Sequence, residues 1–514
     1  MKQRRSRKSK SWLALLIGLS LMFSCNLPKF ETTVGPTSTS FFPTLSIIEI
    51  TTTTPQAPFS PATRIPDRYF TPTPDPQRIL PALRTETVEY TVKPNDTLEN
   101  IAYRYGIGLN TLIQANQITN PDLISVGDIL VVPPPNPKPE GPAFKILPDS
   151  ELVYGPGSKE FDINGFVQFH DGYLFNYQEE ADGEMTSGAN IVSRVSLDYS
   201  INPRLLLALI EYQSGWVTQS EPGESWLEYP LGYENQWRKG LYQQLKWAAN
   251  ELNRGYYLWG VNGISSYVLR DDQVVPPSPG INAGTAALQY VLGLLVDYPI
   301  WLEAVTEDGI FLTFNQLFGY PFDFAIEPLT PDGLTHPFLQ LPFEPGKTWS
   351  FTGGPHGAWG SGSAWGALDF APPGEALGCV QSDAWVVAMA DGLVVRSGNG
   401  TVIQDLDGDG FEQTGWVLLY LHLETRDRVP ENTYLNSGDF VGHPSCEGGT
   451  STGTHVHLAR KYNGEWISAD GPIPFDLESW ISEGYGIAYN GYLKKNGQII
   501  EAWTGRRPEN QIQR

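Results

Sequence analysis

The spacing of hydrophobic residues changes along the chain and predicts two kinds of structure. Between residues 143 and 345, apolar positions recur at helical spacing, most clearly from Pro203 to Tyr212, where proline stands at a favoured helix start. From Trp349 onward, apolar residues form short alternating runs between glycine-rich turns, as in AWVVAMADGLVVRSG and GWVLLYLHLE. We therefore expect a multidomain α+β protein with a helical middle and an antiparallel β-sheet in its C-terminal part.

Composition divides the rest of the chain into linkers and one small unit. Thr, Pro and Ser dominate residues 26–87 with few periodic apolar positions, which is typical of an extended tether. A second proline-rich stretch, VPPPNPKPEGP, forms a hinge. The predicted organisation is a signal at 1–25, the tether at 26–87, a compact unit at 88–133, the hinge at 134–142, a helical domain at 143–345, a β-rich domain at 346–480 and a C-terminal extension at 481–514.

The N-terminus has the pattern of an export signal. A basic head is followed by an apolar run that ends at Ser24 and is shorter than the roughly 20 residues a membrane-spanning helix needs. The SC at its end resembles a bacterial lipoprotein signal, which implies that Cys25 is lipidated and anchors the protein to the outer face of a membrane; simple secretion is the alternative. With Cys25 lipidated, Cys379 and Cys446 remain as a pair. In an oxidising compartment we expect them to form a disulfide rather than two buried free thiols.

The chain is strongly acidic, with a formal net charge of −23. A surface of this sign argues against binding nucleic acid, or an anionic lipid surface, through a broad electrostatic field. Any partner is therefore expected to be neutral or of mixed charge, or to be held at a local site.

Residues 88–133 show the pattern of a strand, two helices and a strand. Tyr90–Val92 make a short strand, Asp96 or Thr97 can cap the first helix, and GDILVVP closes the unit. The segments TVKPNDTLENIA, NQI and ISVGDILVVP resemble the LysM module, a βααβ fold that binds N-acetylglucosamine chains of peptidoglycan or chitin. The resemblance implies a sugar groove between two loops, with candidate residues Pro94, Asn95, Asp96, Thr97, Leu123 and Ile124. A small spacer without affinity for sugar is the alternative.

The apolar helix of the middle segment resembles an enzyme helix but lacks its proton donor. NPRLLLALIEYQSGW is similar to the helix of lytic transglycosylases that ends in a catalytic Glu-Ser pair. Here Gln213 precedes Ser214, and a glutamine amide cannot act as a general acid. Glu211 lies two residues away, and residues two apart do not share a helix face. We expect a non-catalytic helical domain in the lysozyme style; an active domain that uses Glu211 is the alternative.

Histidines concentrate near the C-terminus: five of the seven are His356, His422, His443, His455 and His457. Side chains alternate along a strand, so His455 and His457 are expected to point the same way, with Val456 facing the core. By the same alternation, His422 is expected to share a polar strand face with Leu418 and Tyr420. A catalytic zinc needs three protein ligands and one open position. TGGPHGAWGSGSAWGALDFAPP supplies a further histidine, His356, and a carboxylate, Asp369.

Three motifs in order, GGPH…ALDFAPP, LYLHLE and CEGGTSTGTHVHLARKYNG, resemble the lysostaphin/LytM and β-lytic (LasA-like) family of zinc metalloendopeptidases. Much of that family has a zinc histidine four residues before the aspartate, where this chain has Trp365; the β-lytic branch has the longer spacing seen here. The resemblance implies an antiparallel sheet of the duplicated hybrid motif type. It also implies Zn2+ as the cofactor, with His356, Asp369 and His457 as ligands and His422 and His455 as catalytic, non-ligand histidines.

These features predict an exported peptidoglycan hydrolase of the cell envelope. It would be a zinc-dependent endopeptidase that cuts peptide stems or cross-links and is targeted to glycan by its LysM module. Zinc makes hydroxide available near neutral pH, and His422 and His455 would divide the roles of base and oxyanion partner in an order that the sequence does not decide. The alternatives are a catalytically inactive glycan-binding adaptor or hydrolase activator, and glycan cleavage by the middle domain.

The motif DLDGDG, from Asp405 to Gly410, has aspartates at the spacing that opens a calcium loop. An EF-hand loop needs Glu at its twelfth position, which is Trp416 here. We therefore expect the tip of a β-hairpin, with a calcium site as the alternative.

Overall fold

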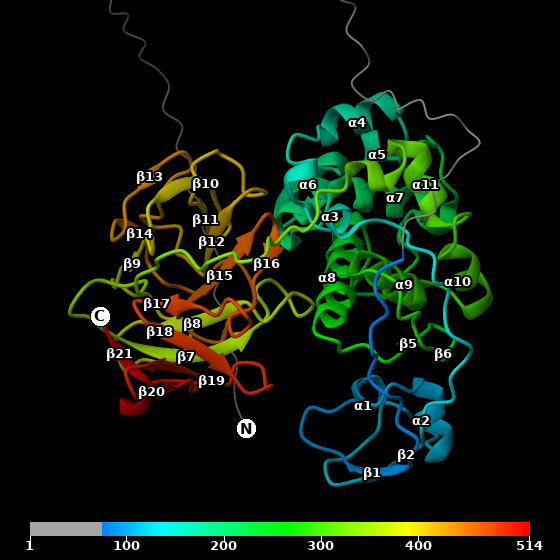
Figure 1. The fold of residues 1–514 in the computed structure, drawn as a ribbon, viewed down its shortest axis with the longest axis horizontal. Helices are drawn as coiled ribbons and strands as arrows, with labels where there is room; N and C mark the ends of the chain where they lie inside the picture. The colour runs from blue at the N-terminus through cyan, green and yellow to red at the C-terminus, as the bar shows by residue number, and fades with distance from the viewer. Residues whose placement is uncertain (1–73) are drawn as a thin grey trace, which may run out of the picture. The chain divides into compact units, whose positions relative to one another are not determined.

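The computed structural model of the chain describes residues 74–514 (Figure 1). The predicted export signal, the lipidation of Cys25 and most of the tether lie outside the described residues, so these stay predictions. Within residues 74–514, no helix combines the length and the apolar character that crossing a membrane requires.

Residues 88–133 form the predicted βααβ unit. Strand β1 (Val88–Thr91) pairs antiparallel with β2 (Ile129–Val132), and helices α1 (Leu98–Arg104) and α2 (Leu109–Ala115) lie between them in the chain. Thr97 caps α1 by accepting a hydrogen bond from the backbone N–H of Asn100. The apolar residues at helical spacing in α1 are buried in the small core, as their period predicts: Leu98, Ile101 and Ala102.

The middle part of the structure is built from helices around α7. Its helices are α3 (Asp149–Leu152), α4 (Ile163–His170), α5 (Tyr173–Asn176), α6 (Gly188–Tyr199), α7 (Pro203–Ser214), α8 (Leu241–Gly260), α9 (Ala283–Leu295), α10 (Tyr298–Ala304) and α11 (Ile310–Phe318). Three 3-10 turns accompany them: η1 (Pro156–Ser158), η2 (Glu224–Trp226) and η3 (Pro321–Phe324). Two short hairpins complete this part, one formed by β3 (Gln178–Ala181) and β4 (Glu184–Ser187) and the other by β5 (Tyr267–Val268) and β6 (Val274–Val275). Asn202 caps α7, and the helix is buried from Pro203 to Ile210. Arg204, the charged residue in that stretch, pairs with the buried carboxylate of Glu151 at 2.6 Å. A helix covered on all sides belongs at the centre of a domain.

The C-terminal part is an antiparallel sheet with smaller sheets packed on it. Its strands are β7 (Thr348–His356), β8 (Ala367–Ala371), β9 (Val386–Val387), β10 (Gly392–Gly398), β11 (Thr401–Asp405), β12 (Trp416–Leu421), β13 (Tyr434–Leu435), β14 (Phe440–Gly442), β15 (Val456–Tyr462), β16 (Glu465–Trp466), β17 (Asp476–Leu477), β18 (Trp480–Gly484), β19 (Gly491–Lys495), β20 (Gln498–Glu501) and β21 (Gln511–Gln513) (Figure 1). In the main sheet, the strands lie in the order β13-β10-β11-β12-β15-β8-β7-β21, and β16 pairs with β15. A further 3-10 turn, η4 (Pro508–Asn510), precedes β21. Strands β7, β8 and β15 are therefore neighbours although they are far apart in sequence.

Both faces of the main sheet are apolar. One face, with Leu418, Tyr420 and Val456, joins the larger core of the C-terminal part. The other face, with Leu419 and Leu421, forms a second cluster that also contains Ala358 and Trp466. The sheet is thus covered on both sides, and polar residues on either face have to find partners inside the protein.

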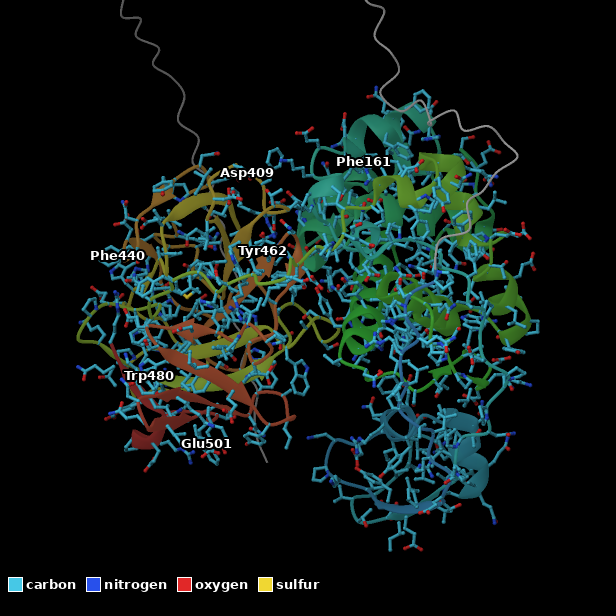
Figure 2. All side chains as sticks on the ribbon, in the orientation of Figure 1. Phe161, Asp409, Phe440, Tyr462, Trp480 and Glu501 are labelled. Atoms are coloured by element: carbon cyan, nitrogen blue, oxygen red, sulfur yellow. A yellow bond between two sulfur atoms is a disulfide. The ribbon has the colours of Figure 1, made fainter. Side chains whose placement is uncertain are left out.

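Two predicted boundaries of the β-rich domain are wrong. The boundary at residue 480 falls inside β18, and β21 pairs with β7, so residues 481–514 complete the same assembly of sheets. Trp480 and Glu501, labelled in Figure 2, lie on two strands of the four-stranded sheet β17-β18-β19-β20. At the other end, Leu339 and Phe343 already belong to the β core, before the predicted start at 346. The apolar pattern could not show this because it records which residues are apolar and not which distant segments they pack against.

The helices and the main sheet share a polar interface. The hydroxyl of Ser200, after α6, donates to the carbonyl of Gly464 in the β15–β16 turn at 2.6 Å. The Tyr257 hydroxyl of α8 accepts the backbone N–H of Trp466 at 2.8 Å, and Tyr256 reaches the carboxylate of Glu465 at 3.2 Å. Helix α8 is therefore directly connected to the strands that carry the candidate site.

Candidate metal centre

Three adjacent strands bring the predicted ligands together. His356 ends β7, Asp369 lies on β8, and His457 lies on β15 directly opposite Asp369. The register of β7 shifts on both sides of Gly353, the residue that pairs with Asp369. A Cβ at Gly353 would lie 2.5 Å from Oδ2 of Asp369, so only glycine leaves room for this carboxylate.

The side-chain atoms of these three residues converge. Nε2 of His356 lies 3.1 Å from Nδ1 of His457 and 3.3 Å from Oδ1 of Asp369. Nδ1 of His457 lies 3.1 Å from the same carboxylate oxygen. All three residues are buried, and this is one of two groups within residues 74–514 whose side-chain atoms could hold a metal ion.

Backbone carbonyl groups orient both histidine rings. Nδ1 of His356 donates to the carbonyl of Gly354 at 2.8 Å, and Nε2 of His457 donates to the carbonyl of Ala358 at 3.0 Å. These hydrogen bonds assign the tautomers, because a carbonyl can only accept. The nitrogen of each ring that faces Asp369 therefore carries a lone pair, which is the state of a metal-ligating histidine.

The chemistry of this group fits a cation. Three acceptor atoms meet without a proton among them, and Oδ1 of Asp369 is buried without a hydrogen-bond partner. Zinc bonds of about 2.0–2.1 Å in a tetrahedral arrangement place ligand atoms about 3.3 Å apart, close to the separations observed here. Burial raises the pKa of Asp369, but the interactions with the neighbouring imidazoles of His356 and His455 outweigh burial and hold the pKa well below its usual range. The carboxylate is thus ionised, as a ligand must be.

Two further histidines border the group. Nε2 of His455 lies 3.6 Å from Oδ1 of Asp369, and the rings of His422 and His455 are 4.6 Å apart. Each donates its Nδ1 proton to a backbone carbonyl, His455 to Gly453 at 2.7 Å and His422 to Glu447 at 2.8 Å. Burial, and then the nearby His455, lowers the pKa of His422 to about 4, so this ring is neutral near pH 7.

The backbone conformation that places His422 beside His455 differs from the prediction. The expected polar face shared with Leu418 and Tyr420 is wrong, because both of these residues are fully buried in the core. Strict alternation would have placed His422 on that core side. Strand β12 ends at Leu421, and His422 has a φ of 66°, a left-handed conformation that turns its ring toward His455.

The loop that carries His455 is tied down at both ends. Cys446 forms a disulfide with Cys379, with a Cα–Cα distance of 5.7 Å. The backbone N–H of Thr454 donates to the carbonyl of Gly378 at 3.0 Å, so the segments on both sides of the loop are joined to the same neighbour. These links restrict the motion of the polypeptide between them and so hold His455 near Asp369.

Sequence reasoning missed Tyr489 at this site. Its ring stacks on His356 with centroids 4.1 Å apart and planes 21° apart, and its backbone N–H donates to the carbonyl of Pro355 at 3.1 Å. The residue lies between β18 and β19, in the segment that the sequence assigned to an extension. No local motif marks it, because only the packing of β18 and β19 beside β7 brings it to the site.

The candidate sugar-binding residues of the LysM unit divide into two groups. Pro94, Asn95 and Leu123 are exposed, whereas Ile124 packs against the core. Asp96 is engaged within the unit, since it accepts hydrogen bonds from the Tyr90 hydroxyl at 2.6 Å and the Lys93 backbone at 2.8 Å. Thr97 serves as the cap of α1. The glycan-binding role of all six residues stays a prediction.

The carboxylate of Glu211 accepts hydrogen bonds from the turn that follows its own helix. One carboxylate oxygen accepts the backbone N–H groups of Val217 and Thr218, both at 3.0 Å, and the other accepts the Thr218 hydroxyl at 2.5 Å. These bonds hold the turn that follows α7. Gln213 has an amide nitrogen that is buried without a partner. Neither side chain has the arrangement of a free general acid.

The motif DLDGDG lies in the connection between β11 and β12, as predicted; Figure 2 labels Asp409 within it. The carboxylate of Asp405 accepts backbone N–H groups from Asp407, Gly408 and Gly410. Its aspartates form the second group that could hold a cation. A calcium site stays an unproven alternative, since these hydrogen bonds already explain the loop.

Two family models match the chain. The model "LasA, N-terminal domain" matches residues 145–330, and the model "LysM domain" matches residues 90–133. The second match confirms the LysM resemblance. The first covers the helical middle part, and the prediction of a lysozyme-like domain there stays a prediction.

Two known relatives match longer or more complete stretches. Protease LasA of Pseudomonas aeruginosa is 29% identical over 352 residues, which cover 63% of this chain and 75% of that protein. The beta-lytic metalloendopeptidase of Lysobacter enzymogenes is 31% identical over 176 residues, which cover 33% of this chain and 93% of that protein. The chain belongs to the beta-lytic metalloendopeptidase family. This confirms the family, and the enzyme class of metalloendopeptidase, predicted from the three C-terminal motifs. Among solved structures, the M23 metalloprotease pseudoalterin aligns over 35% of this chain and 99% of its own, with 23% identity and a TM-score of 0.28.

Proposed function

We propose that this chain is an exported zinc-dependent endopeptidase that hydrolyses peptide stems or cross-links of bacterial peptidoglycan. The observation that carries the proposal is the convergence of His356, Asp369 and His457. Their acceptor atoms lie 3.1–3.3 Å apart with no proton among them, in a member of a metalloendopeptidase family. The alternative of an inactive adaptor has no support from this site, because each proposed ligand atom is present and lies 3.1–3.3 Å from the other two.

In this proposal, His356 Nε2, Asp369 Oδ1 and His457 Nδ1 hold the zinc ion. When bound, zinc polarises the scissile carbonyl and makes hydroxide available near neutral pH. The backbone carbonyls of Gly354 and Ala358 keep the two ligand rings in the tautomers that present lone pairs. The ligand set is therefore preorganised by main-chain atoms of β7 and of the loop that follows it.

We assign the proton transfer to the two bordering histidines. His455 is the base: its Nε2 is unprotonated, and the cation formed on accepting a proton would be stabilised by Asp369, 3.6 Å away. That proton can then pass to the leaving amine. His422 is the oxyanion partner and is neutral at rest; its Nε2 would take up the second proton of the attacking water, donate a hydrogen bond to the oxyanion, and release that proton to the product amine.

The LysM unit would bind N-acetylglucosamine chains and raise the effective concentration of peptide substrate at the metal centre. The exposed loops with Pro94, Asn95 and Leu123 are the proposed contact region. Export, with a lipid at Cys25, would place the enzyme at the cell envelope. Glycan cleavage through Glu211 is not supported, because that carboxylate already accepts three hydrogen bonds.

The test uses residues 26–514, purified with zinc and incubated with peptidoglycan, with mass spectrometry to detect newly freed amino termini. Wild-type protein is expected to release them, and His356→Ala and Asp369→Ala are expected to lose zinc and release none. Loss of a ligand should cost at least about 100-fold, since even outer partners of metal ligands are worth roughly 10–100-fold. His443→Ala is the matched control, because this buried histidine contacts Trp385 and the carbonyl of Ala384 instead of the metal centre.

Either of two results would contradict the proposal. A wild-type protein that binds zinc but frees no amino terminus would mean that the substrate class is wrong. A wild-type protein that binds no zinc would mean that the three converging side chains serve another purpose.

A further inference from the structure

We propose that Asn250 and Arg254 of helix α8 are positioning residues for the metal centre. They act through residues 357–364, the first part of the loop that separates the two predicted ligands His356 and Asp369. The inference rests on the proposed function of the metal centre and adds a role for the helical part of the chain in maintaining it.

Asn250 holds the tip of this loop through both ends of its amide. Its Oδ1 accepts the backbone N–H groups of Ser361 at 3.0 Å and Gly362 at 2.9 Å, and its Nδ2 lies 3.3 Å from the Ser361 hydroxyl. One turn further along α8, Nη2 of Arg254 donates to the same hydroxyl at 2.9 Å. A two-residue pair on one helix face thus satisfies several polar groups at the loop tip.

The fit between helix and loop is too close for any side chain at the contact. A Cβ on Gly362 would lie 1.8 Å from the backbone carbonyl oxygen of Asn250. Beside this contact, the ring of Trp359 meets Tyr199 of α6 edge to face, with centroids 6.4 Å apart. The loop sequence GAWGSGSAWG is therefore shaped to lie against α6 and α8, rather than being a flexible spacer.

The loop passes this restraint to a metal ligand. The N–H of Ala358 donates to the carbonyl of Ala364 at 2.9 Å, and the Ser363 hydroxyl accepts the N–H of Trp359 at 2.9 Å, which closes the loop on itself. The carbonyl of Ala358 then accepts the Nε2 proton of His457 at 3.0 Å. That bond selects the tautomer that presents Nδ1 to Asp369. The continuous path runs from α8 to Ser361, to Ala358 and to His457.

The residues between His356 and Asp369 make both contacts of this path. They bring the carbonyl of Ala358 against His457 and the loop tip against Asn250. The helical part thereby contributes to the geometry of a centre to which it supplies no ligand.

The test compares metal affinity among variants of the whole chain from residue 26. Asn250→Leu removes both acceptor contacts, whereas Asn250→Asp keeps carboxylate oxygens for the N–H groups of Ser361 and Gly362. Tyr256→Phe is the matched control on the same helix, since it removes a 3.2 Å contact to Glu465 and touches neither the loop nor a ligand. Zinc dissociation constants are measured by competition with a chromogenic chelator, and cobalt-substituted protein is measured by visible absorption.

Asn250→Leu is expected to bind zinc roughly 10–100-fold more weakly, in the range seen for outer-shell partners of metal ligands, and to shift the cobalt spectrum. Asn250→Asp is expected to restore both readouts toward wild type, and Tyr256→Phe to leave them unchanged. Arg254→Met is expected to show a smaller loss in the same direction. A merely structural role would alter stability in Asn250→Leu without moving the cobalt spectrum of the folded protein.

Unchanged zinc affinity and spectrum in folded Asn250→Leu would overturn this inference while leaving the proposed function intact. Equal losses in Asn250→Leu and Tyr256→Phe would also overturn it, since the effect would then belong to the whole interface. Failure of the wild type to bind zinc is a separate outcome and contradicts the proposed function itself.

Discussion

Strand β15 carries two buried polar regions on one face, and they differ in what they need. His457 belongs to the proposed metal centre, and Lys461, four residues later on the same side, belongs to an ion cluster. In that cluster Lys461 contacts Glu412 at 2.8 Å, Glu412 contacts Arg396 at 3.0 Å, and Arg396 contacts Asp198 of α6 at 2.6 Å. Two cations and two anions balance each other there.

The metal centre has no such balance from side chains. Its carboxylate, Asp369, faces the lone pairs of two histidines, and no lysine or arginine pairs with it among the described residues. A buried charge is costly unless it is paired or coordinates a metal. Both regions are buried and charged, but only the ion cluster has its charges balanced by the chain's own side chains. The ion cluster should therefore govern stability, and the metal centre should govern ligand binding and catalysis.

The largest difference in effect between the two regions is expected from substitutions of the two histidines beside the proposed metal centre. His422→Ala and His455→Ala are expected to lower the rate of peptide cleavage about 100–10,000-fold, the usual worth of general acid–base catalysis. Zinc content should stay that of the wild type, because neither ring belongs to the ligand set. Rates on a defined cross-linked peptide and metal analysis of the purified variants check this. Loss of zinc in either variant would show that the ligand set is assigned wrongly.

Glu412→Gln should break the ion cluster while sparing the metal centre. It leaves Arg396 and Lys461 with Asp198 as their remaining anion, and removing one partner of a buried pair costs about 3–5 kcal/mol. Denaturant unfolding measures this loss of free energy of unfolding. Asp409→Asn is the control, because its 3.6 Å contact with Lys159 is at the surface and should cost less than about 1 kcal/mol. A parallel fall in the zinc affinity of folded Glu412→Gln would show that the two regions are not independent.

The ion cluster should also give the protein a specific sensitivity to acid. Burial raises the pKa of Glu412, but Arg396 and Lys461 outweigh burial and lower it from 4.5 to about 2. A carboxyl with a lowered pKa in the folded state stabilises the protein fully above its unfolded value, and this stability is lost as pH falls toward the folded value. Unfolding free energy should therefore drop between about pH 4.5 and pH 2. Glu412→Gln should show a flatter profile over the same interval; an identical slope would assign the acid sensitivity to other groups.

The smallest effect is expected at a third carboxylate, Glu211. Its hydrogen bonds to Val217 and Thr218 suggest a cost of about 1 kcal/mol in Glu211→Gln, because glutamine keeps one acceptor oxygen. Peptide cleavage should be unchanged, and no glycan product should disappear. A reducing-end assay on peptidoglycan, run beside the amino-terminal assay, measures both. Release of glycan fragments by wild type but not by Glu211→Gln would revive the transglycosylase alternative.

Sequence reasoning located the candidate site through residues whose chemistry is local. Short motifs made the candidate ligands recognisable, because they contain the ligand residue types at their spacing. These motifs are the His-x-His pair on a strand and the segments TGGPH and ALDF. It failed at His422, where alternation predicted a polar face with Leu418 and Tyr420, although both are core residues. A single left-handed residue changes the side on which a ring lies, and nothing in the surrounding pattern of apolar residues records it.

Boundaries failed for a related reason. Residues 481–514 were predicted to be a separate extension, yet β21 pairs with β7 and Tyr489 stacks on His356. Strand pairing between distant segments depends on backbone hydrogen bonds, which leave little trace in side-chain type. The role of the helical part was equally hard to predict, since the polar contacts of Asn250 and Arg254 with the loop after β7 join residues far apart in the chain.

The amino-acid sequence alone predicted the classes of structure and the available side-chain chemistry: a βααβ unit, helices of period 3.6, alternating strands, and histidines and an aspartate of the types that can ligate a metal. These follow from local periodicity and side-chain type. Which of those groups meet, how each imidazole is oriented, and which distant segments hold them depend on the folded arrangement of the chain. Convergence within about 3 Å depends on strand register, one left-handed turn and a loop seated on α8, all of which arise from contacts between residues far apart in the chain.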